Sequence, residues 1–270
     1  MGVRRIPKEK IASGMGYKSF FVELRNKIAY QSLYAFFGEK YGPRLHRLGS
    51  NYGGWFIPDD LFEVRNINKV LISAGIGFDV SFDLEMLLRG FKVILIDPDE
   101  KCCNFAREAL QDFPEIQVIE AALSETDGLD TLYSFESEIG DRWSSIRPDG
   151  KCTEKQFKSL NLSSLVLATS DSVTEQIMIV KLDIEGAESR QYAPIAELAD
   201  KLDFVCIEID YIVSVSFLNV FEFVKRFIHT LSSFKLMARS GLTLCHREES
   251  NFFWVNYGRN LNYRKASSQS

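Results

Sequence analysis

The sequence predicts an α/β fold of the doubly wound type, built around a mostly parallel β-sheet. Short apolar runs recur along the chain, near residues 70–74, 93–97, 116–119, 177–182, 204–209, 234–238 and 252–257. Segments with helical spacing of apolar residues separate most of these runs. Near-continuous apolar strands joined by helices are typical of a parallel sheet that is covered on both faces.

Length and composition are those of an ordinary globular protein. The chain has 270 residues, of which 46% are hydrophobic and 26% charged. This is enough for one α/β domain with additions. The net charge is −5 and the pI is about 5.4. Nucleic-acid binding is therefore disfavoured, because such proteins usually carry a strong basic surface.

Cysteine usage and the N-terminal region favour a cytoplasmic protein. The five cysteines are an odd set without C-x-x-C spacing, which fits reduced thiols better than a disulfide framework. The apolar stretch at residues 20–38 contains Glu23, Arg25 and Lys27. It is too polar to span a membrane, and no signal-peptide cleavage pattern follows it. We therefore expect no membrane span and a cytoplasmic location.

Four segments differ in pattern along the chain. Residues 1–50 are rich in aromatic residues at helical spacing and predict an N-terminal helical extension that packs on the main domain, or alternatively acts as a lid or oligomer contact. Residues 51–258 form the main domain. Within it, residues 127–174 are polar and predict an irregular insertion that shapes the substrate side. Residues 259–270 predict a disordered tail.

The stretch Lys69–Glu100 has the order strand, glycine turn, helix, strand and acidic residue. Many proteins hold a nucleotide-like cofactor in this way. The turn contains Gly75 and Gly77, whereas Val80 stands where a dinucleotide fingerprint has its third glycine. The second strand ends at Asp97, where a carboxylate can accept both hydroxyls of a ribose.

Two acidic residues at the start of the following helix bear on the choice of cofactor. A pyrophosphate would bind the N-terminus of this helix, and Asp79 and Asp83 would repel it. The same carboxylates are compatible with a cofactor that carries an ammonium and a sulfonium group. This favours S-adenosylmethionine over a dinucleotide.

A second motif, IMIVKLDIEGAES, covers residues 177–189. It is an apolar strand that ends in Lys181-Leu-Asp183 and continues into Glu185 and Glu188. The carboxyl end of a strand next to the first one faces the same crevice as the glycine turn. Such a cluster is costly to remove from water without partners, so it indicates either a functional site or a structural ion-pair network.

Together the two motifs resemble the FkbM-type family of class I S-adenosylmethionine-dependent methyltransferases. The family signature is similar to KLDIEGAE at residues 181–188, and the segments GIGFDVSFD, VIEAALSETDG, FVCIEID and SNFFWVNY follow in family order. The resemblance covers about residues 66–257. It implies a Rossmann-like sheet of seven strands with an antiparallel last strand.

The resemblance also implies roles for individual residues around the cofactor. The backbone at Gly75 and Gly77 would approach the methionine part, and Asp183 would face the transferred methyl group. Ser73 stands where the family often has an acid, which makes Asp79 the candidate partner of the cofactor's amino group. The remaining predicted contacts are Asp97 and Pro98 at the ribose, and Ala122 and Leu123 at the adenine.

The expected reaction is O-methylation of a small molecule or a saccharide. A hydroxyl acceptor must lose its proton, and Asp183, Glu185 and His246 are the candidate proton acceptors. Asp183, Glu185 and Glu208 could also hold a divalent cation, but their spacing does not require one, so no metal is predicted. Two alternatives stay open: a cofactor-binding scaffold without turnover, and an NAD(P)-dependent oxidoreductase.

Overall fold

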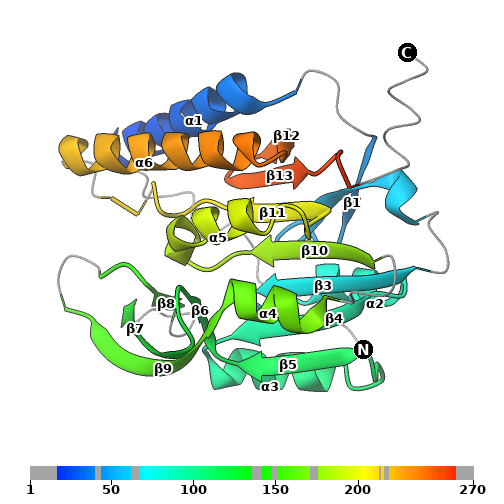
Figure 1. Cartoon of the computed structure of the whole chain (residues 1–270). Helices are drawn as coiled ribbons and strands as arrows, with labels where there is room; N and C mark the ends of the chain where they lie inside the picture. The colour runs from blue at the N-terminus through cyan, green and yellow to red at the C-terminus, as the bar shows by residue number, and fades with distance from the viewer. Residues whose placement is uncertain are drawn as a thin grey trace, which may run out of the picture.

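The computed structural model describes residues 17–39, 44–62, 67–135, 142–147, 151–170, 176–212, 214–215 and 219–259. Its centre is a seven-stranded sheet in the order β12-β13-β11-β10-β3-β4-β5 (Figure 1). The strands are β3 (Asn68–Ala74), β4 (Lys92–Asp97), β5 (Ile116–Glu120), β10 (Gln176–Leu182), β11 (Phe204–Glu208), β12 (Thr243–Glu248) and β13 (Asn251–Val255).

Most neighbouring strands of this sheet are parallel. The pairs β3–β4, β4–β5, β3–β10 and β10–β11 are parallel, whereas β13 runs antiparallel to both β11 and β12. The inner strands are apolar along their length because both of their faces are covered; Val70–Ala74 and Ile177–Leu182 are buried throughout. The predicted mixed α/β fold with a mostly parallel central sheet is confirmed.

Two layers cover the central sheet. One contains α2 (Ser81–Leu87), α3 (Glu100–Ala109) and a hairpin of β1 (Leu45–Leu48) and β2 (Trp55–Pro58), with the 3₁₀ turn η2 (Asp59–Phe62) after it. The other contains α1 (Tyr17–Phe37), α4 (Leu162–Thr169), α5 (Tyr192–Glu197) and α6 (Val220–Arg239). Each layer has its own buried apolar cluster against the sheet.

The segment expected to be irregular at residues 127–174 is largely regular. It contributes β7 (Gly128–Phe135), β8 (Arg142–Ser144), β9 (Thr153–Asn161) and α4, and its strands join β6 (Ala122–Ser124) in a second sheet of order β6-β9-β7-β8. Polar residues dominate here because β9 is exposed along its first half and buries only alternate side chains, including Phe157. Phe157 packs edge-on against Trp143 at 4.7 Å between ring centroids.

Two further expectations need correction. The apolar run at residues 234–238 lies inside α6, where Phe234 and Met237 are buried one helical turn apart; the strand that follows is β12. The N-terminal region contains the long helix α1, but residues 45–48 within it form strand β1. The expected tail beyond Arg259 lies outside the described residues, and Arg259 itself pairs with Asp203 at 3.4 Å.

Two findings bear on the expected environment. All five cysteines are free, and four of them are buried. None of the helices in the described part of the chain combines the length and the apolar character needed to cross a bilayer.

Candidate functional site at the carboxyl ends of the central strands

The glycine turn follows β3 and packs against the end of β10. Gly75 has a φ of +83°, and its N–H donates to the carbonyl of Ile96 at 2.9 Å. A Cβ at Gly75 would lie only 1.6 Å from the carbonyl oxygen of Asp183. Position 75 therefore requires glycine for two reasons, the left-handed backbone and the close approach of the neighbouring strand end.

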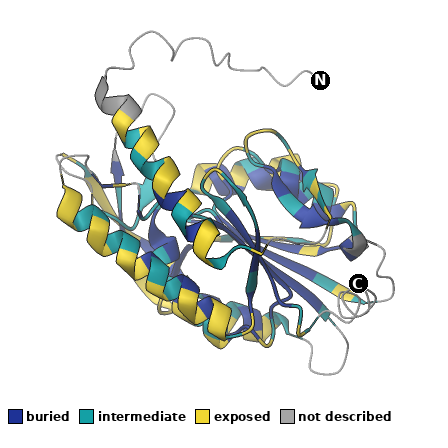
Figure 2. Ribbon diagram, turned by 90° about the horizontal axis from the view of Figure 1, so that it is seen from above, coloured by how far each residue is buried: buried dark blue, intermediate teal, exposed yellow. Residues whose placement is uncertain are grey.

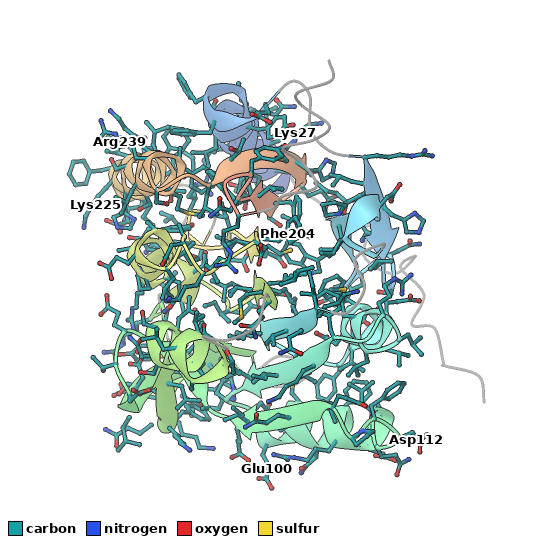
Figure 3. All side chains as sticks on the ribbon, turned by 45° about the vertical axis from the view of Figure 1, so that its right-hand side comes forward. Lys27, Glu100, Asp112, Phe204, Lys225 and Arg239 are labelled. Carbon is teal, nitrogen blue, oxygen red and sulfur yellow. The ribbon has the colours of Figure 1, made fainter. Side chains whose placement is uncertain are left out.

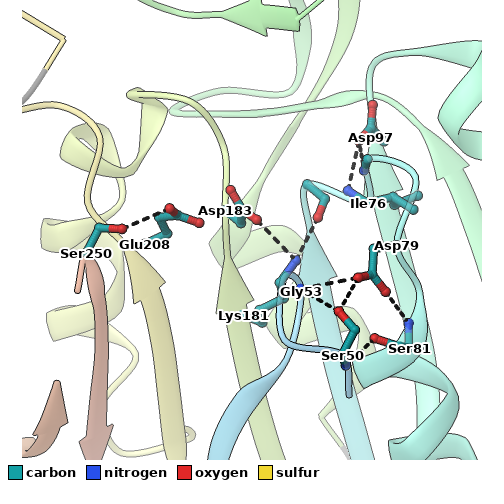
Figure 4. Close-up of polar contacts among 12 residues, drawn as sticks. Ser50, Gly53, Ile76, Asp79, Ser81, Asp97, Lys181, Asp183, Glu208 and Ser250 are labelled. Carbon is teal, nitrogen blue, oxygen red and sulfur yellow. Dashed lines mark hydrogen bonds and ion pairs between the residues drawn. The ribbon is translucent and has the colours of Figure 1, made fainter. Parts of the chain in front are cut away.

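Gly77 differs from Gly75 in what surrounds it. Its φ is +54°, and a Cβ there would meet no atom within 4 Å, so this part of the turn faces open space. The carboxylate of Asp97 accepts hydrogen bonds from the N–H groups of Ile76 at 2.8 Å and Gly77 at 3.3 Å (Figure 4). Burial raises the pKa of Asp97, although hydrogen bonds from Asp99, Ile76 and Gly77 oppose the shift. The glycine turn and the acidic strand end thus form one unit.

Asp79 connects the turn to the loop between β1 and β2. Its carboxylate accepts hydrogen bonds from the Ser50 hydroxyl, the Gly53 N–H at 3.2 Å and the Ser81 N–H at 2.9 Å (Figure 4). Burial alone would raise the pKa of Asp79, but these hydrogen bonds lower it below its ordinary value. The predicted contact of Asp79 with an amino group stays a prediction, since in the structure this carboxylate holds the loop.

A buried ion cluster lies beneath the turn. Lys181 is 4% exposed, donates to the Gly75 carbonyl at 2.7 Å and lies 3.9 Å from the Asp183 carboxylate. Asp83 is also buried; burial raises its pKa, and Lys181 and Ser73 act in the opposite direction. Ser73 is completely buried. Its expected place at the cofactor stays a prediction, because in the structure its side chain faces the buried Asp83.

Carboxylates gather where β10 and β11 end. Burial, followed by the charge of Asp183, raises the pKa of Glu208 to about 8, and the Ser250 hydroxyl donates to Glu208 at 2.9 Å (Figure 4). Burial also raises the pKa of Asp210 well above its ordinary value, with further contributions from Glu208 and Glu188. Glu208 therefore retains its proton near neutral pH.

The two glutamates of the second motif have different positions. Glu188 is completely buried and accepts the N–H groups of Asp210, at 2.8 Å, and Tyr211. Burial raises its pKa to about 7. Glu188 thereby connects the 3₁₀ turn η3 (Ala187–Arg190) to the loop after β11. Glu185 is half-buried, has a φ of +48°, and its carbonyl accepts a hydrogen bond from Ser144 at 2.6 Å.

An open hollow of about 350 Å³ adjoins this motif. It lies between η3, the loop after β11 and the loops of the second sheet, and one residue of α6 contributes to it. Arg190 in its lining pairs with Asp130 at 3.0 Å. The full lining is mainly polar and consists of Glu125, Ser145, Ile146, Gly186, Ser189, Arg190, Tyr211 and His229.

The other predicted residues divide into those near the turn and one far from it. Ala122 and Leu123 are buried in β6, next to Ala121, whose N–H donates to the Asp97 carbonyl at 3.0 Å; Pro98 directly follows Asp97. His246 lies within β12, against the ring of Phe56 at 4.4 Å, and burial lowers its pKa.

Because β12 is three strands away from β10, His246 lies about 14 Å from the end of that strand. His246 therefore lies on a strand and not on a loop, and its expected role as a proton acceptor stays a prediction that this position does not support. Sequence reasoning also missed Asp210, although the alternation Glu208-Ile-Asp210 at a strand end was available as a signal. In the described residues, no three His, Cys, Asp or Glu side chains are arranged to hold a metal ion.

No family model and no curated protein matches the chain. Among solved structures, a candidate caffeoyl-CoA O-methyltransferase from Staphylococcus aureus has 11% identity and a TM-score of 0.40, covering 73% of this chain and 79% of its own. A candidate methyltransferase from Streptococcus mutans, solved with SAH, has 12% identity and a TM-score of 0.39, covering 73% and 92%. At such TM-scores the likeness is weak, and neither family nor cofactor is assigned from it.

Proposed function

We propose that the chain is an S-adenosylmethionine-dependent methyltransferase of the class I type, which methylates a hydroxyl of a small molecule or a saccharide. The observation that carries the proposal is the open space at Gly77, next to the Asp97 carboxylate at the carboxyl edge of the sheet. In open α/β sheets ligands bind at this edge. The KLDIEGAE motif at the neighbouring strand end supports a place in the FkbM-type family.

The residues around the turn fit this cofactor better than a dinucleotide. The Asp79 carboxylate already caps the Ser81 N–H at the start of α2, which is where a pyrophosphate would bind. A second anion there would meet Asp79 at close range. Gly75 and Gly77 would hold the methionine part, Asp97 the ribose, and the β6 segment at Ala122 and Leu123 the adenine. Asp79 fits a cationic group and disfavours NAD.

When bound, S-adenosylmethionine supplies a methyl group on a sulfonium, which is transferred by in-line displacement. The contribution of the chain is to align the acceptor and to take up its proton. The group we assign to the proton is the Asp183 carboxylate at the end of β10, 3.9 Å from the Lys181 ammonium. Glu208 next to it has a pKa raised to about 8 and is mostly protonated at neutral pH, so it does not compete for this proton. Glu185 would bind or orient the acceptor.

The polar hollow is the place we assign to the acceptor. It adjoins Gly186 and Ser189 of the second motif, and Glu125, Arg190, Tyr211 and His229 offer hydrogen-bonding groups around it. A hydroxyl-rich molecule would satisfy these groups, whereas an apolar one would leave them without partners.

Calorimetric titration of the full chain tests the cofactor. S-adenosylmethionine and its demethylated product are expected to bind, and NAD is not. Asp97→Asn is expected to weaken binding about tenfold or more, because the ribose contact is lost. Asp112→Asn, at an exposed aspartate after α3, is the matched control and should bind as the unmodified chain does.

The competing functions predict different results. Binding of NAD alone would refute the proposal in favour of an oxidoreductase. Binding of S-adenosylmethionine without methyl transfer to any hydroxyl acceptor would favour the scaffold. If the Asp183→Asn variant still binds the cofactor but no longer transfers the methyl group, this would support Asp183 as the proton acceptor.

A further inference from the structure

The N-terminal helix α1 packs beside α6 and over the strands β12 and β13 (Figures 1 and 2). Its inner side carries two tyrosines one helical turn apart. The Tyr34 hydroxyl donates to a backbone carbonyl of β12 at 3.2 Å. The Tyr30 ring is buried and meets the ring of Phe252 on β13 edge-on, at 5.9 Å between ring centroids. Figure 3 shows α1, labelled at Lys27, on one side of these strands and β11, labelled at Phe204, on the other.

The Tyr30 hydroxyl contacts the backbone where β11 ends. It donates to the carbonyl of Ile209 at 2.6 Å, and the two residues are 179 positions apart in the chain. The N–H of the same peptide unit belongs to Asp210 and donates to the buried Glu188 carboxylate at 2.8 Å. Because a peptide unit is planar, hydrogen bonds at its two ends fix the orientation of the whole unit. Tyr30 and Glu188 therefore determine together how the chain leaves β11.

The peptide unit held in this way carries the chain from the carboxylates at the strand ends to the polar hollow. Glu208 lies one residue before it and Asp210 at its end, and both carboxylates interact electrostatically with Asp183. Tyr211, the next residue, lines the hollow. A rotation of the peptide unit would therefore move Asp210 and Tyr211 relative to Asp183 and to an acceptor in the hollow.

Two arginines from the same pair of helices hold the loop after β11 at further points. Arg226 of α6 donates to the Tyr211 carbonyl at 3.0 Å, and its guanidinium lies 4.9 Å from the centre of the Tyr211 ring. Arg25 of α1 donates to the Val215 carbonyl at 3.3 Å. Helix α1 thus contacts this loop at two places, so it does more than cover the sheet.

We propose that Tyr30 is a positioning residue for methyl transfer, which acts through the peptide unit between Ile209 and Asp210 on the side chains at the acceptor hollow. This inference rests on the proposed function. It gives a role in the reaction to a helix that precedes the segment with the methyltransferase motifs. The glycine turn follows β3, which is two strands away from β11, so Tyr30 acts on the acceptor side and not on the cofactor.

Two conservative variants of the full chain test the proposal. Tyr30→Phe removes the hydroxyl and keeps the ring, and Tyr34→Phe is the matched control one turn further along α1. Without its carbonyl contact the peptide unit is held at one end only, so the amide hydrogens of Asp210 and Tyr211 should exchange about tenfold faster in Tyr30→Phe. In Tyr34→Phe these amides should exchange at the unmodified rate.

The effect on the reaction is measured by transfer from radiolabelled S-adenosylmethionine to a panel of methyl glycosides and phenols. The kcat should fall about tenfold in Tyr30→Phe and stay unchanged in Tyr34→Phe, because only the first loosens the loop at the hollow. The Kd for S-adenosylmethionine, from calorimetric titration, should be the same in both variants and in the unmodified chain.

The possible contrary results separate this proposal from the proposed function. Equal exchange rates at Asp210 and Tyr211 in the two variants would show that Tyr30 does not hold the peptide unit. Faster exchange in Tyr30→Phe with an unchanged kcat would refute its role in positioning. If the unmodified chain transfers no methyl group to any member of the panel, the proposed function fails and the role in the reaction fails with it, whereas the exchange rates still show whether Tyr30 holds the loop.

Discussion

Replacement of Gly77 by alanine separates the conformational role of the glycine from its role in ligand approach. At a φ of +54° an alanine is in the left-handed region, which costs roughly 1–2 kcal/mol. Its Cβ meets no protein atom within 4 Å, so no steric cost is added. Gly90 and Gly241 have φ values of +80° and +100° and are equally open around a Cβ. The three alanine variants should therefore lose similar amounts of unfolding free energy.

Only the variant at Gly77 should lose cofactor affinity. The added methyl occupies the space into which we place the methionine part, and a loss of tenfold in Kd corresponds to about 1.4 kcal/mol. Urea denaturation measures the first quantity and calorimetric titration with S-adenosylmethionine the second. Equal affinity in Gly77→Ala and Gly90→Ala would refute the assigned place of the cofactor, whatever the stabilities are.

The remaining predictions concern the carboxylates and the core. The folded state raises the pKa of Glu208 from about 4.5 to about 8, so folding favours its protonated form. This contribution to stability is fully present below about pH 4.5 and is lost as the pH rises towards 8. The unfolding free energy of the Glu208→Gln variant should therefore fall less than that of the unmodified chain between about pH 4.5 and about pH 8. Equal slopes of unfolding free energy against pH in the two proteins would contradict this. Asp79→Ala removes the hydrogen-bond acceptor of the Ser81 and Gly53 N–H groups and should lower the unfolding free energy, measured by urea denaturation, by about 1–2 kcal/mol. The amide hydrogen of Gly53 should also exchange faster with solvent. An unchanged exchange rate at Gly53 would refute the role of Asp79 in holding the loop. Phe234→Ala should cost about 3–5 kcal/mol, because this ring is completely buried against Trp254 and Phe252, whereas Phe221→Ala, at an exposed position of the same helix, should cost less than 1 kcal/mol.

The parts of the fold that local pattern determines were accessible from sequence. Strands β3, β4 and β10 are buried on both faces, so their apolar runs are continuous and short. The run at 234–238 was misleading because Phe234 and Met237 belong to a helical stripe that extends over α6. A short apolar window does not separate the two cases. The second sheet was missed because its longest strand, β9, is exposed along its first half and carries few apolar residues.

The candidate site shows the same division between local and long-range information. Gly75, Gly77 and Asp97 follow from a motif within one unit of strand, turn and strand. The atoms that surround these residues cannot be predicted from the motif, because they come from distant parts of the chain. The partner of Asp79 is Ser50, 29 residues earlier, and the carbonyl that excludes a side chain at Gly75 belongs to Asp183. Tertiary packing also decides that Ser73 is buried beneath the turn and that His246 lies in strand β12.

The contact between Lys181 and Gly75 has a consequence for how the protein is made. The two residues are 106 positions apart in the chain. At ordinary translation rates this interval corresponds to roughly 5–20 s, during which β3 exists without β10 beside it. Throughout that time an apolar strand edge is unpaired and the glycine turn lacks the lysine that fixes its carbonyl. The nascent chain therefore exposes this strand edge between the synthesis of β3 and that of β10, and the glycine turn cannot reach its final arrangement before the second half of the chain is made.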